Sequence, residues 1–300
     1  MPWPTLPQKI LQNAEEFGEK PALSQKIESG ETETLTWSQY SDYVMRISRS
    51  LIALGHEEGD RLSIYSFNRK EWFACYAASY FTNGAAVGVY HTCSPDEVEW
   101  IVGNSGSKFV FVGHNPQWGR DPEKLPRNRL SKILESLPEV EHVIMMEDEE
   151  IIDHPIAMSW DDFMTKGDTI EESVVKDRIS NIQPDSSASL IFTSGTTGNP
   201  KGVELTHHNF AFITNQVVEL IVPLDRHDNY ISWLPQAHSF GQVCDNHAFT
   251  VMGLNMTTDG IPWTLLTMQR KYNLTSSLAF PAYTRRSIQM SKPRLTPSRS

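Results

Sequence analysis

The sequence predicts an α/β fold of doubly wound sheets with flanking helices. Strand and helix patterns alternate between residues 62 and 112, the order typical of a sheet whose parallel strands are joined by helical crossovers. A further apolar run at 188–192 leads into a loop rich in glycine and hydroxyl residues, as at the ligand-binding edge of such sheets. The 300 residues are 39% hydrophobic and 21% charged, which is typical of a globular enzyme.

The first predicted unit is a helix followed by a strand and a second helix. Ser38 is the expected N-cap of the first helix, whose apolar side chains recur at helical spacing until Gly55 ends it. Leu62 and Ile64 alternate with polar neighbours, the pattern of a strand. Residues 72–80 carry an aromatic stripe at helical spacing, so we expect these side chains to lie in the core.

Turn and capping signals place the elements that follow. Asn83-Gly84 is a turn signal before a buried strand at 85–90. Ser94-Pro-Asp-Glu97 is a capping box with proline at the first helical position, and the next strand is expected at 109–112.

The second half of the chain has weaker patterns. Residues 114–130 are expected to form a surface loop, and residues 147–187 an acidic irregular segment with a short helix around 160–163. The remaining expected elements are strands at 142–146 and 229–234 and helices at 208–220 and 239–252.

Bulk properties argue against several classes of protein. The net charge of −11 argues against a general nucleic-acid binder. Cys75, Cys93 and Cys244 lie far apart and form no Cys-x-x-Cys pair, so we expect neither a disulfide framework nor a zinc site. The N-terminus has no secretory pattern, and no apolar stretch is long enough to span a bilayer.

The most informative segment is the loop Thr193-Ser-Gly-Thr-Thr-Gly-Asn-Pro-Lys-Gly202. Its N–H groups and hydroxyls can be aimed at phosphate oxygens, its glycines allow a close approach, and Lys201 supplies a cation. It is not a Walker A sequence, because Pro200 precedes the lysine and Gly202 follows it. A solvated turn is the alternative interpretation of any single cluster of this composition.

The loop resembles the AMP-binding signature of the adenylate-forming enzymes, the superfamily of acyl-CoA synthetases, luciferases and peptide-synthetase adenylation domains. Further segments are similar to long-chain acyl-CoA synthetases, and most of all to their bubblegum-type very-long-chain branch. These segments are Gly59–Arg69, Glu71–Phe73, Gly88–Tyr90, Ser94–Glu97 and Leu234–Val243. The resemblance covers residues 10 to about 253 and is loose over 114–187.

The resemblance implies part of the N-terminal large domain of these enzymes and a ligation in two steps. A fatty acid carboxylate is activated by ATP to acyl-AMP, and the acyl group is then transferred to coenzyme A, with Mg²⁺ as cofactor. We therefore expect a long-chain fatty acid–CoA ligase. Two alternatives stay open: a catalytically inactive nucleotide- or lipid-binding fragment, and an adenylate-forming ligase for an aryl or amino acid substrate.

The resemblance also assigns residues to two sites. Lys201 and Thr193 are the expected catalytic residues, and Lys201 would offset charge that grows on the leaving pyrophosphate. The expected nucleotide-binding residues are Thr193, Ser194, Gly195, Thr196, Thr197, Gly198 and Lys201. The residues expected to line the acyl pocket are His238, Ser239, Phe240 and Gly241. A hydrogen-bonded core residue is the alternative interpretation of His238.

The last part of the chain departs from the family pattern. It contains no Tyr-Gly-x-Thr-Glu stretch for magnesium, no Thr-Gly-Asp segment for the ribose and no small C-terminal domain. Residues 1–282 are expected to form a partial AMP-binding N-terminal domain and residues 283–300 a basic, disordered tail. Little activity is expected from such a chain, since several groups that stabilise the transition state are missing.

The expected partners are a fatty acid, ATP and coenzyme A, and no nucleic acid. The expected location is the cytoplasm, with peripheral association with the endoplasmic reticulum membrane as the alternative.

Overall fold

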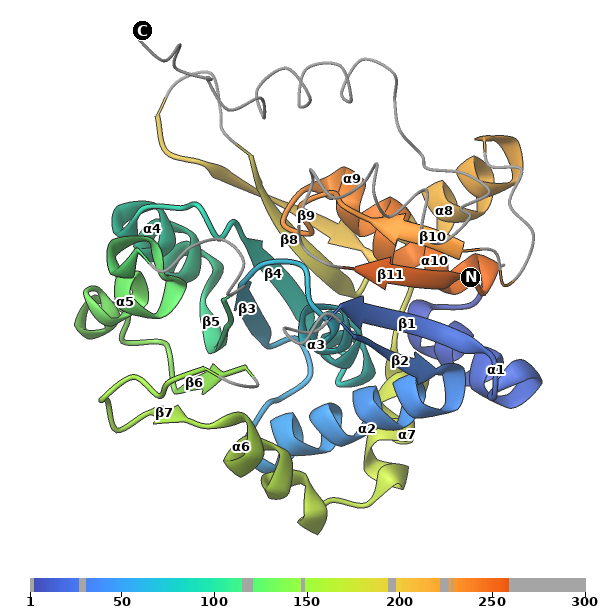
Figure 1. Ribbon diagram of the computed structural model, residues 1–300, viewed down its shortest axis with the longest axis horizontal. Coiled ribbons are helices and arrows are strands. Elements are labelled where there is room, and N and C mark those ends of the chain that lie inside the picture. The colour runs from blue at the N-terminus through green and yellow to red at the C-terminus, as the bar shows by residue number, and fades with distance from the viewer. Residues whose placement is uncertain are drawn as a thin grey trace, which may run out of the picture.

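Two β-sheets form the frame of the chain, and helices pack against them (Figure 1). The computed structural model describes residues 3–26, 31–114, 121–146, 149–193, 198–221, 227 and 229–258. Within these residues a seven-stranded sheet has the order β7-β6-β5-β3-β4-β8-β9, and a four-stranded sheet has the order β10-β11-β1-β2. The predicted α/β class is confirmed.

The larger sheet is parallel except at one edge. Its parallel strands are β7 (Ala157–Met158), β6 (His142–Met145), β5 (Ser107–Val112), β3 (Arg61–Tyr65), β4 (Ala85–Val89) and β8 (Ser187–Thr193). The edge strand β9 (Lys201–Thr206) pairs antiparallel with β8. The strands predicted around residues 62–64, 85–90, 109–112, 142–146 and 188–192 are confirmed. The strand β9 was not predicted, because residues 201–206 mix polar and apolar side chains at an exposed edge.

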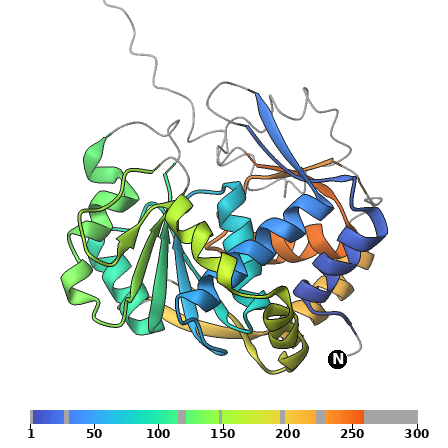
Figure 2. The same ribbon diagram turned by 90° about the horizontal axis from the view of Figure 1, so that it is seen from below.

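Both faces of the larger sheet are covered by helices. Neighbouring side chains of β4 point to opposite faces, so Ala86 joins one core cluster and Val87 the other. The first face carries α2 (Trp37–Ala53), α3 (Lys70–Phe81), α6 (Trp160–Lys166) and α7 (Glu172–Asn181). The second face carries α4 (Pro95–Ser105) and α5 (Pro126–Ser131), as Figure 2 shows. The sheet is therefore doubly wound.

The helix α3 is buried on nearly all of its sides, from Glu71 to Phe81. It lies between the larger sheet, α2 and α7, and it also contacts β1 of the smaller sheet. The predicted aromatic core is confirmed, because Trp72, Tyr76 and Tyr80 are at most 1% exposed. A helix enclosed in this way needs apolar or small residues on every side, not on one stripe alone.

The smaller sheet brings the two ends of the described chain together. Its strands are β1 (Pro21–Lys26), β2 (Thr32–Thr36), β10 (Asn229–Ser232) and β11 (Asn255–Thr258). β11 lies between β10 and β1 and is parallel to both, whereas β2 is antiparallel to β1. The helices beside this sheet are α1 (Leu6–Phe17), α8 (His207–Ile221), α9 (Ser239–Gly241), the π-helix η5 (Gln242–Ala248) and α10 (Phe249–Met252). The helices predicted at 208–220 and 239–252 are thus confirmed.

The predicted start of α2 at Ser38 is wrong, because the N-cap is Thr36. The Thr36 hydroxyl accepts the Gln39 N–H at 3.3 Å, and the Gln39 side chain accepts the Thr36 N–H at 2.9 Å. This reciprocal pair satisfies two donors that a cap at Ser38 would leave unpaired. The predicted capping box of α4, from Ser94 to Glu97, is confirmed.

Two segments expected to be irregular contain helices. Residues 114–130 were expected to form a loop, yet they include the 3₁₀ turn η2 (Pro122–Lys124) and most of α5, and η3 (Leu134–Ser136) follows. In residues 147–187 the short helix predicted around 160–163 is confirmed as α6, but the 3₁₀ turn η4 (Gly167–Thr169) and α7 were not predicted. In α7 only Val175 and Ile179 are buried, so tertiary packing of one short stripe stabilises a helix that is otherwise polar.

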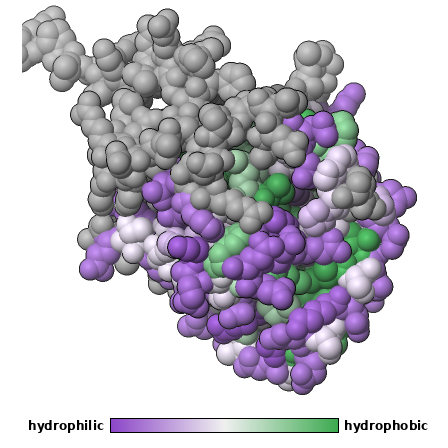
Figure 3. All heavy atoms as spheres, turned by 90° about the vertical axis from the view of Figure 1, so that its right-hand side faces the viewer, coloured by the Kyte–Doolittle hydropathy of each residue, from purple (hydrophilic) through white to green (hydrophobic). Residues whose placement is uncertain are grey.

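Apolar atoms reach the surface in places among polar ones, as the space-filling view of one face shows (Figure 3). The large hydrophobic side chains that are exposed among the described residues are Trp100, Ile151, Val174, Val203, Phe212 and Ile213. None of the helices in the described ranges has the length and apolar character needed to cross a membrane.

A glycine contact between the larger sheet and a distant segment gives a first prediction. A Cβ placed on Gly88 of β4 would lie 2.6 Å from the Cα of Ala237, so Gly88→Ala should lower the free energy of unfolding by about 1–3 kcal/mol. Urea unfolding measures this change. The control is Gly103→Ala inside α4, where a Cβ would have its nearest neighbour at 3.6 Å. It should raise the stability by about 0.4–1 kcal/mol, and equal effects of the two changes would contradict the packing argument.

Candidate nucleotide and acyl site

The predicted phosphate loop is the connection of the β8–β9 hairpin. Thr193 ends β8, Lys201 begins β9, and the two residues are cross-strand partners with exposed side chains. The sequence therefore placed the loop correctly at the end of a strand. The residues at its centre, Ser194, Gly195, Thr196 and Thr197, lie outside the described residues, so their roles stay predictions.

The backbone of this hairpin favours glycine at two positions. Gly198 has φ +90°, in the left-handed region that a side chain disfavours. Gly202 faces Phe192 across the two strands, and a Cβ there would lie 3.1 Å from the phenyl ring. The ring thus packs over the backbone of Gly202. These constraints explain glycine at both positions whether or not a ligand binds.

Other segments that resemble long-chain acyl-CoA synthetases lie at the same edge of the sheet as the hairpin. Since β3, β4 and β8 are parallel, their carboxyl ends lie at the same edge. Residues 66–69 follow β3, Tyr90 follows β4, and the hairpin loop follows β8. The chain leaves β3 towards α3 on one face and leaves β4 towards α4 on the other. The carboxyl ends of β3 and β4 therefore form the topological switch point, where doubly wound sheets bind ligands.

Asn68 connects the switch point to the segment that follows β10. Its amide nitrogen donates to the carbonyl of Leu234 at 2.6 Å, and its amide oxygen accepts the N–H of Gln236 at 3.3 Å. Next to this contact, Ala237 packs on Gly88. The segments 59–69 and 234–243, which both resemble long-chain acyl-CoA synthetases, are thus in direct contact. Sequence reasoning gave Asn68 no role, since its only signal was that resemblance.

The buried carboxyl group of Asp245 holds the same segment from the other side. Its two oxygens accept hydrogen bonds from the Tyr230 hydroxyl at 2.5 Å, the Ser232 hydroxyl at 2.6 Å and the Gln236 amide at 2.6 Å. Asp245 is 0% exposed. Burial raises its pKa to about 7, although the three donors act in the opposite direction.

The four residues predicted to line the acyl pocket lie together where the helical run 239–252 begins. His238 is the N-cap of α9, and its Nδ1 accepts the N–H of Phe240 at 3.1 Å. The side chains of His238 and Ser239 are exposed, and Phe240 is half-buried. Gly241 is buried, and a Cβ there would lie 2.5 Å from the carbonyl oxygen of Pro235. The exposure of His238 contradicts its alternative interpretation as a core residue, while acyl binding by these residues stays a prediction.

A buried polar cluster connects this helical run to α3 and β8. The Tyr76 hydroxyl lies 3.1 Å from Nε2 of His247 and accepts a hydrogen bond from the Tyr80 hydroxyl at 2.5 Å. The side-chain oxygen of Gln242 accepts hydrogen bonds from Tyr76 at 3.3 Å and from Ser189 of β8 at 2.9 Å. Burial lowers the pKa of His247 well below its usual range, so the ring is neutral. The cluster joins α3, β8 and η5.

Arg69 fixes the backbone after β3 by charge and hydrogen bonding. Its Nε donates to the fully buried Glu71 carboxylate at 2.6 Å, and its Nη1 donates to the carbonyl of His114 at 3.1 Å. His114 follows β5, and its N–H in turn donates to Glu149 at 2.5 Å. This set connects the carboxyl ends of neighbouring strands, so its role is to shape the edge.

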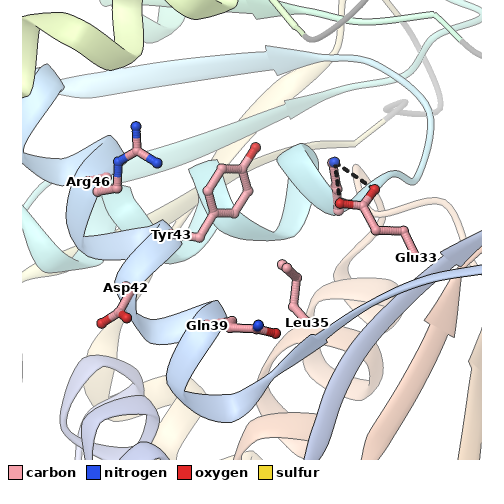
Figure 4. Close-up of a pocket in the computed structure, with 7 residues that line it drawn as sticks. Glu33, Leu35, Gln39, Asp42, Tyr43 and Arg46 are labelled. Atoms are coloured by element: carbon pink, nitrogen blue, oxygen red, sulfur yellow. Dashed lines mark hydrogen bonds and ion pairs between the residues drawn. The ribbon is translucent and has the colours of Figure 1, made fainter.

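A separate hollow lies between α2 and β2 (Figure 4). Its volume is about 290 Å³, and it is lined by Glu33, Leu35, Gln39, Asp42, Tyr43, Arg46 and Lys70. The Lys70 ammonium pairs with Glu33 at 2.8 Å across it. No residue of the two predicted sites lines this hollow. In the part of the chain that the structure describes, no group of three or more His, Cys, Asp or Glu side chains is arranged to hold a metal ion.

The raised pKa of Asp245 gives a prediction with a definite sign. The pKa of the Asp245 carboxyl is about 7 in the folded state, against the ordinary value of 3.8 in the unfolded chain. The stabilising contribution of its bound proton is therefore fully present below pH 3.8. That contribution is lost as pH rises towards 7, at up to about 1.4 kcal/mol per pH unit. Asp245→Asn should remove this dependence. Urea unfolding of the unchanged chain and of Asp245→Asn, each at pH 5 and at pH 7, measures the difference in their stability at each pH.

The exposed carboxyl of Asp42 on α2 is the matched control. Asp42→Asn should change the stability equally at pH 5 and 7. If Asp245→Asn also has the same effect at both pH values, the carboxyl group does not titrate in this range and the assignment is wrong.

Comparison with known proteins agrees with this geometry. A family model described as AMP-binding enzyme matches residues 10–298, which extends beyond residue 253, where the resemblance in individual segments fades. The chain is 31% identical over 248 residues to long-chain-fatty-acid–CoA ligase ACSBG2 of Homo sapiens, covering 80% of this chain and 35% of that protein. It is 24% identical over 283 residues to ACSBG1 of Macaca fascicularis, covering 92% of this chain and 38% of that protein.

The fold has solved counterparts as well. The N-terminal domain of FACL13 from Mycobacterium tuberculosis superposes with a TM-score of 0.75 at 17% identity, covering 97% of this chain and 66% of that one. The predicted resemblance to bubblegum-type long-chain acyl-CoA synthetases is confirmed, and the chain spans about a third of the length of these curated relatives. From its signature loop, its sheet and the match over residues 10–298, the chain belongs to the AMP-binding enzyme family.

Proposed function

We propose that this chain contributes the phosphate-binding hairpin and part of the acyl site of a long-chain fatty acid–CoA ligase. One observation carries the proposal. The signature hairpin presents Thr193 and Lys201 side by side at the carboxyl edge of a doubly wound sheet. Lys201 is exposed and has no ion pair with any described residue, so its charge is available to a ligand. The relatives named long-chain-fatty-acid–CoA ligase support the substrate class.

The proposed first step forms an acyl-adenylate. A carboxylate oxygen of the fatty acid attacks the α-phosphorus of ATP, the bond from that phosphorus to the bridging oxygen of the β-phosphate breaks, and pyrophosphate leaves. Negative charge grows on the leaving group, and the Lys201 ammonium offsets it. The Thr193 hydroxyl, on the facing strand, is a second donor to the same phosphates. Both side chains act by position and charge and form no covalent bond.

The proposed second step transfers the acyl group to coenzyme A. The thiolate sulfur attacks the acyl carbon, the bond from that carbon to the phosphate oxygen breaks, and AMP leaves. His238, Ser239, Phe240 and Gly241 are proposed to line the path of the acyl chain, because this segment lies beside the switch point through the contacts of Asn68 and Gly88. The described residues include no group of three or more His, Cys, Asp or Glu side chains that could hold a metal ion, and we propose no ligand for Mg²⁺ among them.

The experiment that tests this function supplies labelled palmitate, ATP and coenzyme A to the chain and separates acyl-AMP from acyl-CoA. Formation of either product supports ligation, and benzoate or an amino acid in place of palmitate tests the other adenylate-forming substrates. Binding of ATP without any product indicates the second candidate, a nucleotide-binding fragment without turnover. If the chain neither binds ATP nor forms a product, the proposal is wrong.

The variant Lys201→Ala tests the phosphate hairpin directly. Loss of a charge-assisted contact should weaken ATP binding by about ten- to a hundredfold, as measured by calorimetry. Lys176→Ala is the matched control, because Lys176 is an exposed lysine of α7 that pairs with Glu172 on the same helix. Its ATP affinity should equal that of the unchanged chain. An unchanged affinity in Lys201→Ala would remove Lys201 from the site.

A further inference from the structure

The phosphate hairpin is tied to a helix on the second face of the sheet. The indole N–H of Trp100, on α4, donates to the carbonyl oxygen of Pro200 at 2.8 Å. The two residues are 100 positions apart in the chain, so the contact is tertiary. Pro200 directly precedes Lys201, and its carbonyl belongs to the same peptide unit as the Lys201 N–H. The bond therefore acts on the residue proposed to bind phosphate.

The helix that carries Trp100 is itself held firmly. Its N-terminus has a complete capping box, in which the Ser94 N–H donates to Glu97 at 2.8 Å. Val98, Ile101 and Val102 are at most 3% exposed and pack into the core of the second face. Trp100 points outward from this packed helix, with 37% of its surface exposed. A side chain on such a rigid element can restrain a loop more effectively than a side chain on another loop.

A second observation places the loop against α4. Asn199 lines a hollow of about 450 Å³ together with Trp100 and the acidic residues Asp96 and Glu99 of the same helix. The carboxyl groups make this hollow an unsuitable place for phosphate itself. The described end of the loop, Asn199 and Pro200, therefore lies against α4.

Lys201 is constrained from two directions. The strand pairing with Thr193 holds it from β8, and the Trp100 bond orients the peptide unit that precedes it. Restricting the backbone on both sides reduces the conformational entropy that the loop loses when it binds a ligand.

We propose that Trp100 is a positioning residue, which presets the backbone of the phosphate hairpin so that Lys201 faces the triphosphate. The inference rests on the proposed function of the hairpin and adds a residue outside the signature loop. Trp100 acts through Pro200 and makes no contact with the ligand. It should therefore alter the affinity for the triphosphate, while the fold and the contacts to the rest of the nucleotide stay the same.

The test compares Trp100→Phe, which keeps an aromatic ring and removes the N–H donor, with Trp160→Phe, the same substitution at a buried tryptophan of α6. Amide hydrogen exchange over residues 198–206 measures the restraint without any ligand. Calorimetry with ATP and with inorganic tripolyphosphate measures its consequence. In Trp100→Phe we expect exchange in this segment to be faster and both affinities to be weaker, each by roughly two- to tenfold. Trp160→Phe should leave all three unchanged, and circular dichroism checks that both variants fold.

The outcomes separate this inference from the proposed function. Unchanged exchange over 198–206 in Trp100→Phe overturns the positioning role, whatever the chain binds. Faster exchange with unchanged ATP and tripolyphosphate affinity also overturns it, because the restraint would then not serve phosphate binding. If the unchanged chain binds neither probe, the proposed function fails and the positioning role fails with it. If Trp100→Phe weakens the affinity for ATP and tripolyphosphate but Lys201→Ala does not, then Trp100 still anchors the hairpin, and Lys201 is not the phosphate ligand.

Discussion

The parallel pairing of β3, β4 and β8 is the constraint on which the rest of the structure depends. Parallel strands end at the same edge, so loops separated by more than a hundred residues in the chain become neighbours. The crossovers α3 and α4 leave this edge on opposite faces, so the ends of β3 and β4 form the switch point of the sheet. Each segment of the proposed site is placed by this geometry and not by its own conformation.

The surroundings of the switch point are shaped by close backbone contacts and by buried polar groups. Gly88 lets Ala237 approach the sheet within a distance that any side chain would prevent. Asn68 and Asp245 hold the segment between residues 232 and 237 from its two sides, and their hydrogen bonds reach five different groups of that region. Such a network is costly when it is incomplete, because each buried polar atom without a partner loses its hydration. This cost favours one arrangement of the segment that leads into the predicted acyl residues.

The hairpin differs from this buried segment, because it lies at the edge of the sheet with polar, exposed side chains. Strand β9 is exposed along most of its length, and Val203 is 46% exposed. Few apolar contacts therefore restrain its backbone. The pairing with β8, the ring of Phe192 over Gly202 and the indole of Trp100 supply the restraint instead. This arrangement is compatible with the proposed phosphate binding, which needs donors that stay free for the ligand on a backbone that stays in place.

The sequence by itself determined the fold class, the central strands, the capping box of α4 and the position of the signature loop after a buried strand. These features depend on local periodicity and on neighbouring residues, which a single chain segment contains. The cap of α2 at Thr36 is also a local feature, since Thr36 and Gln39 form a Thr-x-x-Gln capping box. Only the tertiary structure decided that 201–206 is a strand, and that Asn68, Asp245 and Trp100 contact the proposed site. Those outcomes depend on how separate elements pack together. Trp100 and Pro200, or Asn68 and Leu234, have no periodic relation that would reveal their contact before the strands are assembled.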